Sequence, residues 1–430
     1  MKNLKELTFI FLILSLHLVF GLWMSRNMLF FYSRVEFAWK MFHGDFFKNL
    51  FVDFIPPGYY FITGALAQIT PFSIGFWQKF VDLLSGDLII AFVTVHALYK
   101  KNINWIYPLI LGVFCFGLLT PLTLQGGEAV VALPVILGLW CLSKKRYILF
   151  ALLFAFSIWF KFLQIFVFPA VGIYLLIRYI YYKPERRLIL VSILIILLSF
   201  GLYVFLDNAT GLRFQLYRSK SLSFGYGVFD NLITFVRNIA SYSFIVFLSL
   251  PFAFFGKKLL SINIYISSAL CTLVAISIFG IGPYYVYPVI ALMYVGVFMS
   301  KKVKIPPTAV LFSVLFGIII MQTNPLVNIF HGSNQTKQEK NRLINEINKN
   351  YHGGVVVIPF DFALEFPFRH YLLDGLPTET EGLNQIEYVF TPDGLVPDKI
   401  VKNCHLTYSS RIENLILYKT KCGENYGNRG

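Results

Sequence analysis

Charge, cysteine and the common soluble-enzyme motifs are all scarce in this chain. Only 14% of its 430 residues are charged and 57% are hydrophobic, whereas soluble domains carry about 25% charged residues. The composition therefore excludes a soluble globular protein. The sequence contains no P-loop, dinucleotide-binding glycine pattern, zinc-protease motif or nucleophile elbow. It has no internal repeat, and no series of acids in its apolar segments indicates a proton pump.

The five cysteines fall into two groups. Cys115, Cys141 and Cys271 lie in apolar segments, where cysteine behaves as a small core residue. Cys404 and Cys422 lie in the polar C-terminal part and could pair if that part is in an oxidising compartment. None of the spacings is that of a metal site. The sequence therefore assigns no metal ligands and no organic cofactor, and it leaves open whether a divalent cation takes part.

What the sequence does contain is a series of long apolar segments, most of them near the ~20 residues that a helix needs to cross a bilayer. No small-residue cleavage site follows the first one, which we expect to be retained as a helix. The predicted fold is an all-α polytopic membrane bundle of about 11–12 transmembrane helices. The short segment 58–71 decides between the two numbers. The expected spans are 7–24, 58–71, 76–99, 104–121, 128–143, 147–161, 164–181, 188–206, 230–255, 258–280, 284–299 and 305–323.

The net charge of +15 is gathered in short clusters between the apolar segments. This distribution follows the positive-inside rule, so we assign the clusters to the cytoplasm and do not expect nucleic acid as a partner. Lys2 and Lys5 place the N-terminus on the same side. We expect a multi-pass protein of the plasma membrane or an equivalent membrane, with its C-terminal part outside the cytoplasm. The clusters are Lys100–Lys101, Lys144–Arg146, Arg178–Arg187, Lys257–Lys258 and Lys301–Lys304.

Two domains are expected. Residues 1–323 form the transmembrane domain, with a first outer loop at 25–57, and residues 324–430 form a small soluble extracytoplasmic α/β domain. In this second domain the apolar spacing predicts an amphipathic helix over 337–350. Strands are predicted at 355–359, 388–390 and 415–418.

The first outer loop is long for so early a position, and it places acids among aromatic residues. A carboxylate in an apolar environment is suited to act as a general base at a membrane surface. Glu36, Asp45 and Asp53 could each act as that base, and Arg34 lies in the same loop. The structural alternative is an interfacial helix with aromatic anchors and solvated charges.

Two further segments carry candidate substrate-binding residues. Glu128 follows a Gly–Gly pair at the expected outer end of a span, where glycine lets a ligand approach closely and an acid also favours the helix dipole. Lys161 lies at membrane depth with Gln164 in the same segment. An ionisable residue there indicates function, and a lysine that snorkels to the surface is the alternative.

Charge and aromatic residues mark two more outer segments. Arg213 and Arg218 add positive charge where the positive-inside rule disfavours it, which a phosphate or pyrophosphate headgroup would explain. An ordinary solvated loop is the alternative. Tyr284 and Tyr285 lie at another outer helix end, as substrate contacts or as interfacial anchors.

The order of these segments resembles that of the integral-membrane C-type (GT-C) glycosyltransferases, which use polyprenyl-phosphate sugars as donors. The shared arrangement is a first helix, a long outer loop with a carboxylate, and re-entry into an apolar segment at Pro56–Pro57. Residues 124–170 are similar to the central block of the polyprenyl- or dolichyl-phosphate-mannose-dependent mannosyltransferases. That block has a small polar turn, a helix, a basic turn, a second helix and an apolar stretch ending in proline. The resemblance covers about residues 1–300.

The resemblance implies transfer of mannose or a similar hexose from a polyprenyl-phosphate donor. The acceptor would be a lipid-linked glycan or another acceptor on the outer face, and membrane lipids would surround the protein. Family members usually carry an Asp near the start of the loop. This chain has Phe31, Tyr32 and Ser33 there. The resemblance therefore implies that Glu36 or Asp53 is the base, or else that the chain is inactive. It also implies Arg34 as a candidate cation for the donor phosphate.

Two classes of alternative function remain open. One is a polymerase or ligase of surface polysaccharide, which would also need outer loops and cationic sites. The other is a non-enzymatic flippase or scaffold for lipid-linked glycans. A transporter would favour paired halves with matched broken helices, and the sequence shows none.

Overall fold

The structure is a computed structural model whose described residues form two compact units, a helical unit within residues 1–327 and a mixed α/β unit that contains residues 328–430. The described residues are 3–25, 38, 41–42, 57–100, 103–117, 127–160, 163–206, 232–233, 236, 263–279, 286–300, 305–323, 333–349, 351–358, 370–372, 385–392, 396–412 and 415–422.

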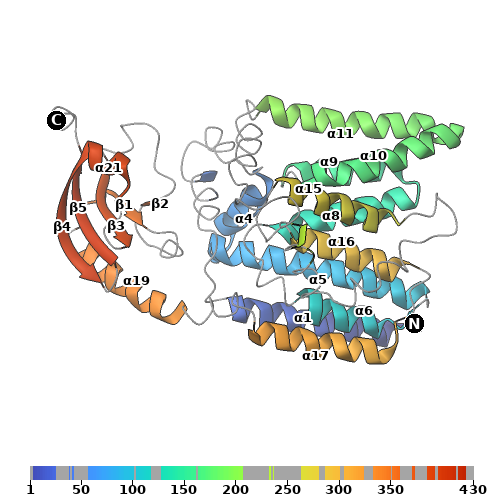
Figure 1. Ribbon diagram of the computed structural model, residues 1–430, viewed down its shortest axis with the longest axis horizontal. Coiled ribbons are helices and arrows are strands. Elements are labelled where there is room, and N and C mark those ends of the chain that lie inside the picture. The colour runs from blue at the N-terminus through green and yellow to red at the C-terminus, as the bar shows by residue number, and fades with distance from the viewer. Residues whose placement is uncertain are drawn as a thin grey trace. The chain divides into compact units, whose positions relative to one another are not determined.

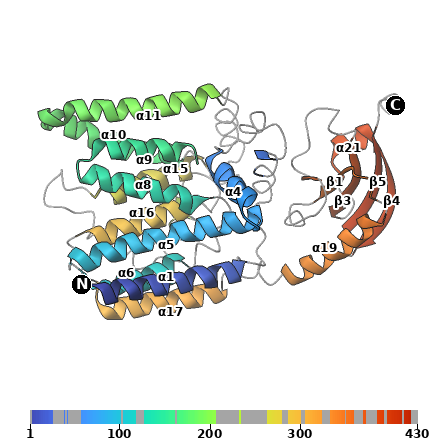
Figure 2. The same cartoon turned by 180° about the vertical axis from the view of Figure 1, so that it is seen from behind.

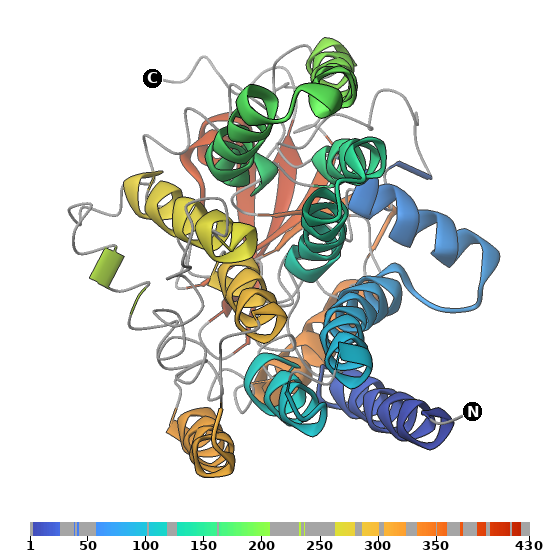
Figure 3. The ribbon, with the colours of Figure 1, turned by 90° about the vertical axis from the view of Figure 1, so that its right-hand side faces the viewer.

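The helical unit is a bundle. Figures 1 and 2 show its long helices running in about the same direction, and Figure 3 views them nearly end-on. Neighbours along the chain pack together in the pairs α8–α9 and α15–α16, whereas α1–α5 and α9–α11 are contacts between distant segments. The elements are α1 (Leu4–Ser25), α4 (Gly58–Ile69), α5 (Ile74–Lys100), α6 (Ile106–Leu111), the π-helix η1 (Gly112–Gly117), α8 (Glu128–Ser143), α9 (Tyr147–Ile158), α10 (Leu163–Tyr181), the 3₁₀ helix η2 (Lys183–Glu185), α11 (Arg186–Leu206), α15 (Ile264–Phe279), α16 (Val286–Met299) and α17 (Pro307–Thr323).

Three helices in the described part of the chain are long and apolar enough to cross a membrane, namely Leu4–Trp23, Ile74–Lys100 and Lys183–Leu206. In α5, 61% of the most apolar 18-residue stretch is buried inside the bundle, whereas the value is 22% for the corresponding stretches of α1 and α11. Helix α5 is therefore central, and the other two present apolar faces outward. The mostly helical architecture agrees with the prediction. The expected number of spans is only partly visible, because several apolar helices are short and most of 230–255 lies outside the described residues.

Helix α4 is the short segment on which the number of spans depended. It begins after Pro57, whose fixed φ suits the start of a helix, and it ends at Thr70, which is extended because Pro71 follows it. Its 12 residues rise about 18 Å, less than the ~30 Å hydrocarbon core. Helix α4 does not span a membrane by itself.

The C-terminal unit is built on a five-stranded sheet with the strand order β2-β1-β3-β5-β4. Strand β1 runs parallel to β2 and β3, and β5 is antiparallel to β3 and β4. The predicted strands at 355–359, 388–390 and 415–418 correspond to β1, β3 and β5, whereas β2 and β4 were not predicted. The elements are α19 (Ser333–Asn348), β1 (Val355–Ile358), β2 (His370–Leu372), β3 (Ile386–Pro392), α21 (Asp398–Asn403), β4 (Cys404–Ile412) and β5 (Leu415–Cys422).

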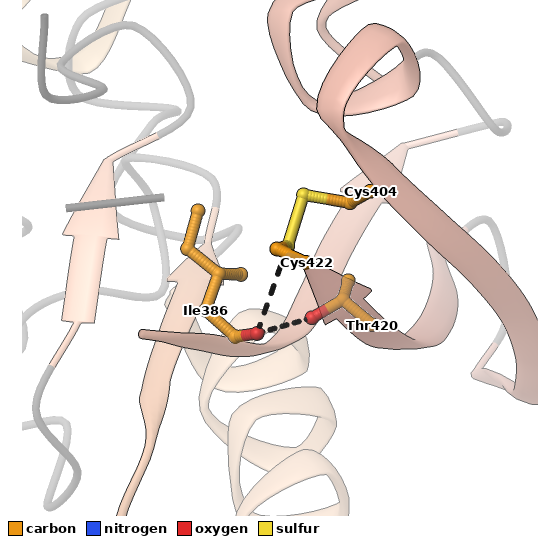
Figure 4. Close-up of a disulfide and its surroundings, with 4 residues drawn as sticks. All are labelled: Ile386, Cys404, Thr420 and Cys422. Atoms are coloured by element: carbon orange, nitrogen blue, oxygen red, sulfur yellow. Dashed lines mark hydrogen bonds between the residues drawn. A yellow bond between two sulfur atoms is a disulfide. The ribbon is translucent and has the colours of Figure 1, made fainter. Parts of the chain in front are cut away.

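Apolar packing and a disulfide hold this unit together. Leu343 and Ile347, on the predicted apolar face of α19, are fully buried. Cys404 and Cys422 face each other in the register of β4 and β5 and form a disulfide. Figure 4 shows its surroundings, where the Thr420 hydroxyl donates a hydrogen bond to the Ile386 carbonyl. The pairing that the sequence left conditional is present, and it is typical of an oxidising compartment.

Glu387 on β3 fastens the segment that leads into β1. Its carboxylate accepts hydrogen bonds from the backbone N–H groups of His352 and Gly354 and pairs with the His352 ring at 2.9 Å. Burial alone would raise the pKa of Glu387. The hydrogen bonds outweigh burial and lower the pKa below its ordinary value of 4.5. This carboxylate therefore stabilises the fold most in its ionised form.

We predict that acid weakens this attachment. Since the folded state lowers the pKa of Glu387, its contribution is fully present above about pH 4.5 and is lost as the pH falls through the lower, folded-state pKa. Hydrogen exchange of the β1 and β3 amides in the full chain, followed from pH 7 down to pH 3, measures this loss. A Glu387→Gln variant should exchange faster at pH 7 and respond less to acid. An identical pH response in the two proteins would contradict the assignment.

Candidate functional site

A buried carboxylate joins three parts of the helical unit. Asp82, in the first half of α5, is 1% exposed. Its Oδ2 atom accepts a hydrogen bond of 3.1 Å from the Tyr59 hydroxyl of α4 and another of 3.1 Å from the backbone N–H of Gly127, just before α8. The Tyr59 hydroxyl also lies 3.0 Å from the Gln78 carbonyl oxygen. The outer ends of α4 and α8, as the sequence places them, are thus fixed to α5 through one side chain.

The turn before α8 is shaped by glycine. Gly127 has φ of +71°, in the left-handed region that favours glycine, and a Cβ atom there would lie 3.1 Å from the Tyr59 ring. Glu128 follows as the first residue of α8 and is 2% exposed. The close approach of Tyr59 therefore sets the position at which a second buried carboxylate enters the site.

Helix α4 is also tied to the junction between α9 and α10. The backbone N–H of Gly58 donates a 2.7 Å hydrogen bond to the Trp159 carbonyl. The Trp159 indole in turn donates to the Ser199 hydroxyl of α11 and packs edge-on against Tyr203. Three segments that are far apart in the sequence consequently meet around the first turn of α4, namely 57–60, 127–128 and 159–160.

Polar groups around Asp82 make the region unlike an ordinary membrane core. Gln78 is fully buried, and its side-chain amide has no hydrogen-bond partner within the described residues. Lys79 is 8% exposed and lies one turn before Asp82 on α5. Buried polar groups are costly unless they are bonded, so their concentration here indicates a functional site. Among the described residues, no group of three or more His, Cys, Asp or Glu side chains is arranged to hold a metal ion.

Among the predicted site residues, Glu128 is the one whose side chain lies in the described part of the structure. Gln164 belongs to the first turn of α10, next to the Trp159 junction. The other predicted residues lie outside the described part of the chain, so their roles stay predictions. They are Arg34, Glu36, Asp53, Lys161, Arg213, Arg218, Tyr284 and Tyr285.

Sequence reasoning missed the polar residues inside the spans. Asp82 was not identified, and neither was the buried pair in which His17 Nδ1 of α1 lies 2.7 Å from Asp87 Oδ1 of α5. The available signal was an ionisable residue within an apolar segment, which indicates function or a specific partner. What the sequence could not supply was the partner, 70 residues away in the case of His17 and Asp87.

Comparison with known proteins places the fold. No family model and no curated protein matches the sequence. Two crystal structures of ArnT from Cupriavidus metallidurans match the structure, one in the apo state and one bound to undecaprenyl phosphate. Each has a TM-score of 0.63 and covers 96% of this chain and 98% of the other, at 14% and 13% identity. The chain therefore has an ArnT-like fold, and its apolar helices are those of an integral membrane protein.

We predict that Asp82 is required for the stability of the helical unit. Asp82→Ala removes the carboxylate that accepts from both the Tyr59 hydroxyl and the Gly127 N–H, at a cost of about 1–3 kcal/mol in the free energy of unfolding. Asp82→Asn keeps an acceptor oxygen and should lose less. Thermal unfolding of the detergent-purified protein measures both variants. An alanine variant as stable as the wild type would show that these contacts do not hold the helices.

The close approach at Gly58 gives a steric prediction. A Cβ atom there would lie 2.7 Å from the Trp159 carbonyl oxygen, a distance that forces backbone to shift. Gly58→Ala should therefore lower the melting temperature. Gly201→Ala in α11 is the matched control, because its Cβ would meet nothing within 4 Å and alanine favours a helix by about 1 kcal/mol over glycine. Equal effects of the two substitutions would refute the steric explanation.

Proposed function

We propose that the chain is a membrane glycosyltransferase of the C-type superfamily, one that uses a polyprenyl-phosphate sugar as donor. The observation that carries the proposal is the ArnT-like fold over 96% of the chain, in agreement with the family that the order of sequence segments resembles. The transferred sugar is mannose or a similar hexose. The acceptor is a lipid-linked glycan or another acceptor on the outer face of the membrane.

The lipid carrier has support from a second direction. One of the matching ArnT structures is bound to undecaprenyl phosphate, which belongs to the class of lipid that the sequence resemblance implies as carrier. A polyprenyl phosphate is anionic at its head and apolar along its chain. The head would need cations near the membrane surface, and the chain would lie against apolar helices such as those of the bundle.

Chain connectivity limits how far two of the predicted residues can lie from the contact between Gly58 and Trp159. Asp53 precedes Gly58 by five positions, so their Cα atoms can be at most about 18 Å apart. Lys161 follows Trp159 by two positions, which limits that Cα separation to about 7 Å. Because Gly58 and Trp159 are hydrogen-bonded to each other, one of the two candidate bases and one of the four candidate cations are joined by short stretches of chain to the same contact.

The proposed reaction is an inverting transfer. Glu36 or Asp53 takes the proton from the acceptor hydroxyl, whose oxygen attacks the anomeric carbon of the donor. The bond from that carbon to the lipid phosphate breaks, and the phosphate leaves with the electron pair. Arg34, Lys161, Arg213 and Arg218 are the candidate cations that would stabilise its charge. Glu128, Gln164, Tyr284 and Tyr285 would contact substrate. Since the phosphate is already a good leaving group, positioning and charge stabilisation dominate.

The same proposal assigns the two domains and their sides of the membrane. Residues 1–323 form the transferase domain and residues 324–430 an extracytoplasmic domain with a structural or acceptor-contacting role. The disulfide between Cys404 and Cys422 supports an oxidising location for the second domain. The cytoplasmic assignment of the N-terminus follows from the distribution of basic residues.

The test is transfer by the purified protein. It is incubated with a panel of radiolabelled polyprenyl-phosphate sugars and a membrane extract, and products are separated by chromatography. We expect transfer from one donor, and a loss of about 10²–10⁴-fold on replacing the base by alanine, at Glu36 or at Asp53. Asp45→Ala is the matched control and should retain activity, because Asp45 is an acid of the same loop that the family resemblance does not assign as the base.

Other outcomes separate the alternative functions. Transfer that survives both Glu36→Ala and Asp53→Ala would overturn the assigned base while leaving the enzyme class intact. Absence of transfer from every donor, combined with movement of a lipid-linked glycan across a reconstituted bilayer, would instead identify a flippase. Chain extension of a glycan without consumption of a lipid-phosphate monosaccharide would identify a polymerase.

A further inference from the structure

A basic surface lies at the opposite end of α8 from the Asp82 site. Helix α8 begins at Glu128 and ends at Ser143, so its ends are about 24 Å apart. The turn after it lies beside the turn that joins α10 to α11, and salt bridges connect the two. We use the term basic surface for seven residues of these turns, Lys144, Lys145, Arg146, Arg178, Lys183, Arg186 and Arg187.

One acid holds the two turns together. Glu185 Oε1 lies 3.1 Å from Lys145 Nζ and 3.0 Å from Arg178 Nη2, and Oε2 accepts a hydrogen bond from the Tyr147 hydroxyl. The Arg178 guanidinium also stacks 4.0 Å from the centre of the Tyr182 ring. Basic clusters more than 30 positions apart in the sequence are therefore part of one surface.

The backbone at Lys145 shows that the arrangement is specific. Lys145 has φ of +61°, at the helix-ending position where glycine is the usual residue. Its N–H bonds to the Leu142 carbonyl, and the N–H of Arg146 bonds to that of Cys141. This conformation is strained for a lysine, and it directs the side chain to Glu185.

Several cations of the surface remain available. Arg178 and Lys145 are engaged by Glu185, and Arg186 donates to the carbonyls of Tyr179 and Ile180 at the end of α10. Lys144, Lys183 and Arg187 are exposed and have no acidic partner within the described residues. Arg146 is exposed as well and lies over the Trp140 ring. Exposed cations thus lie on a surface whose own acid is already paired.

Apolar side chains flank these cations. Leu149 and Leu152 of α9, Ile180 of α10, and Leu188 and Leu194 of α11 are all exposed on the helices that leave the two turns. A ligand that fits must therefore have an anionic head and apolar chains that can lie against those helices.

We propose that the basic surface binds the headgroups of anionic glycerophospholipids in the leaflet opposite the Asp82 site. Cationic side chains at the end of apolar helices match both the phosphate and the acyl chains of such a lipid. The separation along α8 distinguishes this site from the one proposed for the polyprenyl-phosphate donor. The proposal does not depend on the transferase function.

The experiment compares lipid retention by three forms of the full chain. Wild type, a triple variant with Lys144→Gln, Lys183→Gln and Arg187→Gln, and a control with Arg342→Gln, Lys402→Gln and Lys421→Gln are reconstituted in nanodiscs. The nanodiscs contain phosphatidylcholine with phosphatidylglycerol or cardiolipin, and native mass spectrometry after release counts the bound lipids. The control removes the same charge from exposed positions of the C-terminal unit.

We expect wild type and control to retain anionic lipid over phosphatidylcholine. The triple variant should bind it about tenfold or more weakly, and added salt should weaken retention by the wild type. An equal loss of lipid retention in the control would show that only the net charge of the protein matters, and would overturn the proposal. So would retention of polyprenyl phosphate alone, of no lipid, or of an acidic protein in place of lipid. If the triple variant fails to fold, a variant with Lys144→Arg, Lys183→Arg and Arg187→Lys is measured together with the salt titration of the wild type. These changes conserve charge, so this variant should preserve retention of anionic lipid.

Discussion

The carboxylate of Asp82 is the interaction on which the candidate site depends. A carboxylate is costly to bury unless hydrogen bonds replace its water, so its neighbours are constrained to supply donors. The Tyr59 hydroxyl and the Gly127 N–H do so from two other parts of the chain. Removing the Asp82 carboxylate would take a buried acceptor from both donors. The first turn of α4, the body of α5 and the start of α8 are therefore held in one arrangement.

Close contacts at two glycines add to those of Asp82 in fixing the position of α4. Gly58 lies so close to the Trp159 carbonyl that a Cβ atom there would force the backbone to shift. At Gly127 a Cβ atom would be tight against the Tyr59 ring, and the positive φ would strain any other residue. Helix α4 is too short to span a membrane, and its first turn depends on these contacts for its position.

The two ends of α8 differ in the polar and charged side chains around them. At one end, α8 begins with the buried Glu128, next to the contact of Gly127 with the buried Asp82. At the other end, cations exceed acids and face outward, in a region suited to a layer of phosphate. Between them the helix is apolar and mostly buried. The C-terminal unit is stabilised separately, by its own core, its disulfide and the Glu387 attachment.

Local patterns in the sequence determined much of this architecture. The apolar run at 128–143 coincides with α8, the spacing of Leu343 and Ile347 defined the buried face of α19, and the apolar run at 355–358 is β1. These features follow from the periodicity and composition of short segments, which do not depend on the rest of the fold. Asp82 with its partners, the pair of His17 and Asp87, and the joining of two basic turns by Glu185 were decided only by the tertiary structure. Each unites groups far apart in the chain, and the burial that makes such a pairing necessary exists only once the helices have packed.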